Sequence, residues 1–258
     1  VHGGGSLGLS KELVRHFFRS LGPVTEVGGG VCGEAGEEAQ RLDFGACAAH
    51  DYTDLVHSRA IVLWGRNPVV TGLHLVPFLQ QARERGVPVA LVEVLPTASA
   101  KLADRVVTIA PGADGLLALA ILRRLHDAGR LDAGAVAQTE NFAGFEPLLL
   151  SDGWEGFARR CGARPEEVEF LASLFADHRP TATLVGWGLQ RRASGGRNLR
   201  LIDALGLLTG NVGRPGAGVN FTSWRRRGLD ASHLAQATGR ELRAPCFGQD
   251  LAALRDPP

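Results

Sequence analysis

Several absences narrow what this 258-residue chain can be. It contains no methionine, even at position 1, so we expect a processed or excised piece of a longer protein. Its 28 lysines and arginines balance 27 aspartates and glutamates, so no basic surplus points to nucleic acid or to an anionic membrane as a partner. No apolar run approaches the ~20 residues that span a bilayer, so we expect no direct membrane insertion.

Cysteine is also scarce. The chain has four cysteines, far apart and without a CxxC pair, so it carries neither a zinc knuckle nor an iron–sulfur ligand set of its own. The eight histidines show no metal-ligand spacing, and the HExxH, P-loop and EF-hand motifs are absent. With 45% apolar residues, the chain can still bury a full core in one or two domains.

The sequence does contain short apolar runs of the kind that form buried strands. Four of them, without apolar–polar alternation, are Ala60–Trp64, Pro88–Val92, Val106–Ile109 and Thr181–Trp187. Such runs are typical of parallel strands covered by helices on both faces. The helical patterns between and after them are Leu73–Gly86, Ala98–Ala103, Gly115–Leu125, Pro165–Ala176 and Arg197–Leu208. We therefore predict an α/β fold, a doubly wound, mainly parallel sheet with flanking helices.

The first three of these runs lead into residues suited to ligand contact. Gly65-Arg66-Asn67-Pro68 follows the first strand, Glu93 the second and Pro111-Gly112-Ala113-Asp114 the third. Ligands of open α/β sheets bind outside the carboxyl ends of the strands, so these ends predict one shared nucleotide crevice. We expect Asp114 to cap the helix that follows it.

The N-terminal glycines match two catalytic patterns by letter. Gly3, Gly5 and Gly8 fit the dinucleotide fingerprint GxGxxG, and Glu26 lies near where a ribose-binding acid would fall. The overlapping stretch GGSLG fits the hydrolase elbow GxSxG. Both motifs need a strand directly before them, where only two residues are present. A glycine turn before an amphipathic helix at Lys11–Leu21 is therefore favoured, and an NAD-binding Rossmann enzyme stays an alternative.

Six segments in a fixed order resemble the central part of a molybdopterin-dependent oxidoreductase of the dimethyl sulfoxide reductase family. The first is Cys32 with the later Phe44-Gly45. The others are DLVHSRAIVLWGRNP, HLVPFLQQARERG, LADRVVTIAPGADGLLALA, GWGLQRRASGG and RLIDALGLLTGNVGRPGAGVN. LTGNVGRPGAG and LWGRNP are the most specific, and the resemblance covers most of residues 1–221.

The resemblance implies a set of site residues. Cys32 takes the position of the metal ligand, which would bind as a soft thiolate. Arg200 takes that of an arginine that lies beside the metal in some branches and would orient an anionic substrate. The residues that match contacts to a bis(molybdopterin guanine dinucleotide) cofactor are Gly65, Asn67, Thr71, Glu93, Gly112, Asp114, Gly188 and Gln190. The implied cofactor carries molybdenum or tungsten, and a [4Fe-4S] cluster is expected only in an N-terminal domain outside this sequence.

The function implied is that of the central region of a catalytic subunit performing two-electron redox on a small-molecule substrate. Its expected partners are the remaining domains of the parent enzyme and an iron–sulfur electron-transfer subunit, and we expect the fragment alone to be inactive. The alternative is a cofactor-free scaffold relative, as in the large iron–sulfur subunit of respiratory quinone oxidoreductases. Retention of Cys32, Asn67, Asp114 and Gln190 argues against it.

Two positions depart from the family pattern. Glu93-Val94-Leu95 stands where the family usually has Asp-Pro-Arg, so an arginine contact is lost. Gly33 follows Cys32 where formate dehydrogenases have histidine, so formate is not the expected substrate. The division of the chain in the family implies a Rossmann-like cofactor-binding domain at 31–199. Residues 1–30 and 200–258 would form part of a second, discontinuous α/β domain.

Overall fold

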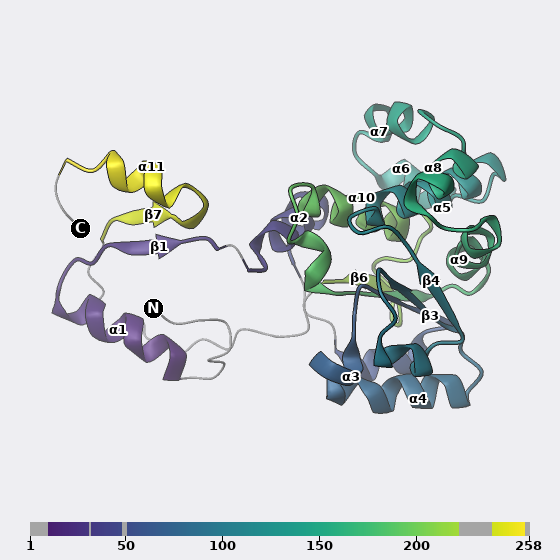
Figure 1. The fold of residues 1–258 in the computed structure, drawn as a ribbon, viewed down its shortest axis with the longest axis horizontal. Coiled ribbons are helices and arrows are strands. Elements are labelled where there is room, and N and C mark those ends of the chain that lie inside the picture. Colours follow the sequence, from purple (N-terminus) through teal and green to yellow (C-terminus); the bar gives the residue numbers. More distant parts are fainter. Residues whose placement is uncertain (1–9, 31, 48–50, 222–238, 256–258) are drawn as a thin grey trace. The chain divides into compact units, whose positions relative to one another are not determined.

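A computed structural model describes residues 10–30, 32–47, 51–221 and 239–255 (Figure 1). The chain divides into two compact units, residues 1–34 with 224–258 and residues 35–223. The division differs from the expected one because residues 200–221 belong to the second unit. The predicted boundary at residue 199 falls inside helix α10 (Gly195–Leu208), and the following strand β6 (Gly218–Asn220) pairs with the sheet of that unit.

The second unit is built on a five-stranded, all-parallel sheet. Its strand order is β4-β3-β2-β5-β6, and Val62 in β2 aligns with Ala90 of β3 on one side and with Thr183 of β5 on the other. The remaining strands are β2 (Ala60–Trp64), β3 (Val89–Glu93), β4 (Arg105–Thr108) and β5 (Thr181–Val185). The predicted fold class is confirmed, and the first strand has the predicted bounds.

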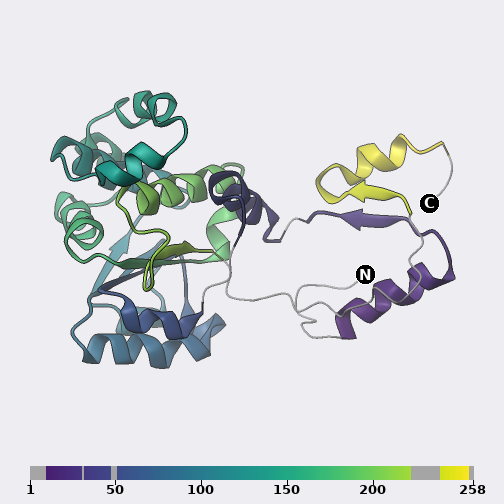
Figure 2. The same ribbon diagram turned by 180° about the vertical axis from the view of Figure 1, so that it is seen from behind.

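Helices cover both faces of this sheet, as Figures 1 and 2 show from opposite sides. One face carries α3 (Pro68–Thr71), α4 (Val76–Glu84) and the 3-10 helices η1 (Tyr52–His57), η2 (Leu73–Leu75) and η3 (Ala98–Leu102). The other face carries α5 (Asp114–Asp127), α8 (Trp154–Cys161), α9 (Pro165–Asp177) and α10, with α6 (Ala133–Gln138) and α7 (Phe142–Leu149) beyond them. This two-sided cover explains why the strand sequences are apolar throughout.

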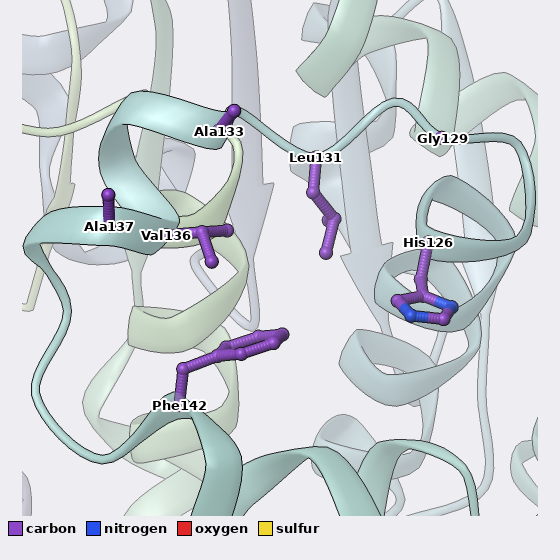
Figure 3. Close-up of a pocket in the computed structure, with 7 residues that line it drawn as sticks. All are labelled: His126, Gly129, Leu131, Ala133, Val136, Ala137 and Phe142. Carbon is purple, nitrogen blue, oxygen red and sulfur yellow. The ribbon is translucent and has the colours of Figure 1, made fainter.

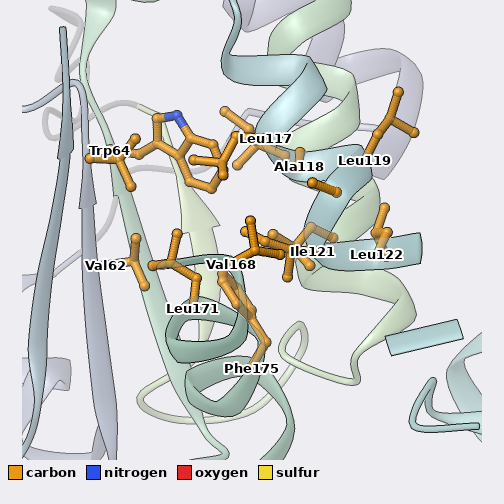
Figure 4. Packing of buried hydrophobic residues seen from close by; sticks show 14 of the residues in the cluster. Val62, Trp64, Leu117, Ala118, Leu119, Ile121, Leu122, Val168, Leu171 and Phe175 are labelled. Atoms are coloured by element: carbon orange, nitrogen blue, oxygen red, sulfur yellow. The ribbon is translucent and has the colours of Figure 1, made fainter. Parts of the chain in front are cut away.

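The buried core therefore consists of two clusters. Val62 and Trp64 of β2 belong to the cluster beneath α5, α8 and α9, together with Leu117 and Phe175 (Figure 4). The intervening Leu63 belongs to a second cluster with residues of α4. All five residues of β2 are fully buried. Each large apolar side chain buried in this way contributes ~1.5–3 kcal/mol, so the sheet is held from both sides.

Some element boundaries differ from expectation. Asp114 does not cap α5; Ala113 holds the cap position, and Asp114 is the first helical residue, with its side chain turned to Trp64. The helix expected from Leu73 begins with a 3-10 turn, since Pro77 lacks the N–H that a regular helix would use there. Residues 131–162, which lie between the predicted helices Gly115–Leu125 and Pro165–Ala176, contain α6, α7 and α8.

The first unit pairs segments from the two ends of the chain. It contains α1 (Ser10–Leu21) and the parallel strands β1 (Glu26–Gly28) and β7 (Glu241–Arg243), followed by η5 (Ala244–Cys246) and α11 (Phe247–Ala252). Glu26, the expected ribose-binding acid, accepts hydrogen bonds from Arg19 at 2.7 and 2.9 Å. The glycine motifs at residues 3–8 lie outside the described residues. No helix in the described part of the chain has the length and apolar character needed to cross a bilayer.

Candidate functional site

The sheet has a topological switch point between β2 and β5. From β2 the chain proceeds to β3 on one side, whereas β5 and β6 extend the sheet on the other. At the carboxyl ends two glycines approach closely: Gly65, with a φ of 59°, follows β2, and Gly186 follows β5. Gly186 N–H donates to the Trp64 carbonyl at 2.8 Å, and a Cβ at Gly186 would lie 1.7 Å from the Gly65 oxygen. Only glycine allows this approach, at the place where α/β sheets bind ligands.

A cavity of about 350 Å³ opens at this edge of the sheet. It brings together five of the eight predicted cofactor-binding residues, which come from the ends of four different strands. They are Gly65, Glu93, Gly112, Asp114 and Gly188. The cavity has the size of a small-molecule site.

Two acidic side chains in this cavity are electrostatically coupled. Asp114 is 5% exposed, and its Oδ1 accepts a hydrogen bond of 3.0 Å from the Trp64 indole Nε1. Burial raises the pKa of Asp114, while the Trp64 hydrogen bond and the charge of Arg192 oppose that rise. Burial also raises the pKa of Glu93, to which the charge of Asp114 adds. Together these carboxyls can accept hydrogen bonds from the N–H groups of a base or the hydroxyls of a sugar.

Two arginines complete the wall of the cavity, and the sequence reasoning missed both. Arg191 and Arg192 line it beside Glu93 and Asp114. Gly112 has a φ of 82°, and a Cβ there would lie 2.6 Å from Arg192 Nη1, so the glycine makes room for the guanidinium. The sequence feature that could have revealed these arginines is the Arg-Arg pair that directly follows Gln190, after β5. Guanidinium groups pair with phosphate oxygens, often through two parallel hydrogen bonds.

Three predicted cofactor-binding residues lie outside the cavity wall. The Asn67 side chain accepts a hydrogen bond of 2.6 Å from Ser99 Oγ, and its carbonyl accepts one of 3.0 Å from Thr71 Oγ1. Both residues therefore stabilise the turn around α3. Gln190, in η4 (Trp187–Gln190), is buried, and its Oε1 accepts a 2.6 Å hydrogen bond from the N–H of Gly36.

Gly36 belongs to α2 (Glu34–Phe44), the helix that follows the predicted metal ligand Cys32. The N–H groups of Cys32 and Gly33 donate to the Glu34 carboxylate at 3.2 and 2.8 Å, which closes the turn before the helix. Cys32 is exposed and belongs to the first unit.

Arg200, the second predicted catalytic residue, lies on α10. Its Nε donates to Asp43 Oδ1 in α2 at 2.7 Å, so its guanidinium forms an ion pair within the second unit. Its side chain is still 54% exposed. The ion pair therefore orients the guanidinium and leaves much of it open to other contacts.

A second cavity, of about 360 Å³, lies away from these residues among α5, α6 and α7 (Figure 3). Its walls include Leu131, Val136 and Phe142, with His126 at one side. None of the predicted site residues lines it. Among the described residues, no group of three or more histidine, cysteine, aspartate or glutamate side chains gathers as a metal site.

Residues 5–249 match the model of a protein family described as molybdopterin oxidoreductase. The chain is 40% identical over 215 residues to the probable oxidoreductase YyaE of Bacillus subtilis, covering 83% of this chain and 32% of that protein. It is 29% identical over 209 residues to the probable dimethyl sulfoxide reductase chain YnfF of Escherichia coli, covering 70% and 26%.

Among solved structures, acetylene hydratase from Pelobacter acetylenicus is similar in fold. The TM-score is 0.61 at 18% sequence identity, and the match covers 72% of this chain and 25% of that one. The chain thus spans about a third of the length of the first curated relatives it matches.

Proposed function

Because this chain belongs to the molybdopterin oxidoreductase family, we propose that it is the central cofactor-binding region of the catalytic subunit of a larger redox enzyme. The family implies a molybdenum or tungsten pterin cofactor, and its members are oxidoreductases. The finer proposal is that the cofactor is a bis(molybdopterin guanine dinucleotide) and that the parent enzyme performs two-electron redox on a small substrate. The remaining domains, a [4Fe-4S] cluster in one of them and an iron–sulfur electron-transfer subunit belong to the same proposal.

The observation that carries the proposal is the cavity at the switch point. Its glycines leave backbone exposed to a ligand, as a pyrophosphate requires. Glu93 and Asp114 supply acceptors for the guanine and ribose end. Arg192 supplies a cation beside them, which offsets the arginine that the sequence lacks after Glu93. These residues fit one nucleotide end of the proposed cofactor.

The proposed metal ligand is Cys32. When bound, the molybdenum or tungsten centre supplies the two-electron redox chemistry. In this proposal the chain contributes a thiolate at the turn before α2 and the partly exposed Arg200 guanidinium, which would orient an anionic substrate. Gln190 contributes indirectly, because it holds the first turn of α2 through Gly36.

The test is to purify the parent protein and to measure its metal content by mass spectrometry and its pterin and GMP content after acid release. Wild-type protein should contain about one metal per chain. A Glu93→Gln/Asp114→Asn double variant should lose most of its guanine nucleotide, because neutral amides present fewer acceptors to guanine. Glu84→Gln, an exposed acid on α4, is the matched control and should retain it. Wild-type protein without metal or pterin would support the cofactor-free scaffold alternative instead.

A further inference from the structure

Three contacts along one face of α2 join it to the rest of the second unit. Gly36 N–H donates to Gln190, Gln40 Nε2 donates to Asp203 Oδ1 at 2.9 Å, and Asp43 accepts from Arg200. These α2 residues are spaced four and three apart, so they share one side of the helix. The second and third contacts both reach α10, and they meet at a pair of carboxyl groups, Asp43 and Asp203.

This carboxyl pair lacks donors for two of its oxygens. Asp203 is 1% exposed, and within the described part of the chain neither its Oδ2 nor the Oδ2 of Asp43 has a hydrogen-bond partner, although both atoms are buried. Buried polar atoms are nearly always hydrogen-bonded. Two ionised carboxylates are both acceptors and cannot satisfy each other, whereas one proton between them turns one oxygen into a donor.

The electrostatics agree with this protonation. Burial is the main cause that raises the pKa of Asp203 to about 8, and the charge of Asp43 and the hydrogen bond that a protonated Asp203 would donate to its side chain add to the rise. The hydrogen bond from Gln40 and the charge of Arg200 act in the opposite direction. Arg200 donates directly to Asp43, so the negative charge of the pair is best stabilised on Asp43 and the proton on Asp203.

The other groups around the pair fix the orientation of Gln40, which donates to Asp203. On the α2 side, burial and the charges of Glu37 and Asp203 raise the pKa of the Cys47 thiol to about 11, against the opposing charge of Arg41. Cys47 therefore keeps its proton and donates from Sγ to Gln40 Oε1 at 3.3 Å. On the sheet side, the β6 carbonyl of Val219 accepts from Gln40 Nε2 at 2.9 Å. Gln40 thus has its orientation fixed, with its amide N–H toward Asp203.

We propose that Asp43 and Asp203 share a single proton across the contact between α2 and α10, and that they act together as positioning residues for Arg200. Asp203 donates its proton to Oδ2 of Asp43, and Asp43 keeps the negative charge that holds Arg200 Nε. The role of this pair in positioning Arg200 for catalysis rests on the function proposed above. The shared proton itself does not depend on that function. Above the titration of Asp203, a second buried negative charge repels the first and weakens the link between the two helices.

Isotope-edited infrared spectroscopy of the 258-residue chain, with ¹³C-labelled aspartate carboxyls, tests the shared proton. At about pH 6, well above the usual aspartate pKa of ~3.9, wild-type protein should show the carbonyl band of a protonated carboxyl. The band should disappear as pH rises through about 8. Asp203→Asn should lack it, because the amide can donate to Asp43 and accept from Gln40 without a proton. Asp104→Asn, an aspartate paired with Arg83, is the matched control and should keep it.

A second measurement follows Arg200 itself. In ¹⁵N-labelled protein, with Arg200→Lys for assignment, the Nε–H resonance should keep its ion-paired shift in Asp203→Asn across the pH range in which the wild-type infrared band disappears. It should lose that shift in Asp43→Asn, and in wild-type protein it should move with the infrared band. The proposal is overturned by wild-type protein with no protonated aspartate at pH 6, or by a band that persists unchanged in Asp203→Asn. Neither readout needs metal or pterin, so its failure is separate from that of the proposed function.

Discussion

The close approach of Gly65 and Gly186 makes a quantitative prediction for Gly186→Ala. The new methyl would lie 1.7 Å from the Gly65 oxygen, 2.6 Å from its carbonyl carbon and 3.1 Å from the Arg66 Cα. All three are backbone atoms of the residues after β2, so no flexible side chain can move aside. The strand ends must separate, and the 2.8 Å hydrogen bond from Gly186 N–H to Trp64 must lengthen or break.

The expected cost follows from these two effects. Overpacking a dense interior costs ~1–3 kcal/mol, and a buried backbone hydrogen bond left unmade costs a further ~1–3 kcal/mol. Gly186→Ala should therefore lower the free energy of unfolding of the second unit by about 2–6 kcal/mol. This is a large share of the ~5–15 kcal/mol of a typical domain.

Urea unfolding monitored by far-UV circular dichroism measures this loss. Gly188→Ala is the matched control, two residues further on, because a Cβ there meets nothing within 4 Å. It should stay within ~0.5 kcal/mol of wild type. Because Gly188 lines the cavity, its methyl should still reduce cofactor content in the parent protein. If the two variants have equal stability, the close approach of the strand ends is not a constraint on this fold.

Three further predictions concern buried polar contacts. Trp64→Phe retains a buried aromatic ring but removes the donor to Asp114, so the pKa of Asp114 should rise further. The unfolding free energy should fall by ~1–3 kcal/mol from the lost hydrogen bond, and the space left by the smaller ring should add to the loss. Carboxyl ¹³C NMR and urea titration measure the two effects. The pKa of Asp203 is higher in the folded state than the usual aspartate value of ~3.9. The contribution of Asp203 to stability is therefore complete below pH ~4 and is lost as pH rises to about 8, by up to ~1.4 kcal/mol per pH unit. Thermal melts across this range should show a smaller slope in Asp203→Asn, and an equal slope would contradict the assignment. Gln190→Ala leaves the Gly36 N–H without its acceptor. Amide hydrogen exchange at the start of α2 should therefore accelerate at least tenfold. Unchanged exchange would show that Gln190 does not hold this helix.

The sheet was predictable because its strands are buried on both faces. Ala60–Trp64 has no polar residue, so its assignment as a central parallel strand did not depend on neighbouring chain. The cavity residues Gly65, Glu93 and Gly112 were predictable for the same reason, since each lies within three residues after the pattern of a strand. Once parallel strands are assigned, their carboxyl ends must lie on one edge.

The remaining parts of the site depend on contacts between distant residues, which a single sequence does not reveal. Arg192 reaches Gly112 only because of a left-handed backbone turn, and Gln190 turns away from the cavity to meet α2. The carboxyl pair of Asp43 and Asp203 needs α2 and α10 side by side. Each residue by itself resembles an ordinary helical aspartate, so its unusual protonation follows from tertiary packing alone.

Helix α2 also has an evolutionary consequence. Its anchoring face contacts residues 154, 163 and 157 positions later in the chain, at Gln190, Asp203 and Arg200 respectively. At the contact between Gln40 and Asp203, both of which are buried, a substitution on either side leaves a buried polar group without its partner, at a cost of ~1–3 kcal/mol. Relatives that diverge here are therefore expected to change both members together, so that correlated substitutions connect the helix after Cys32 with α10. Substitutions in the helix that follows the proposed metal ligand would then be accompanied by substitutions in α10, far from Cys32 in the sequence.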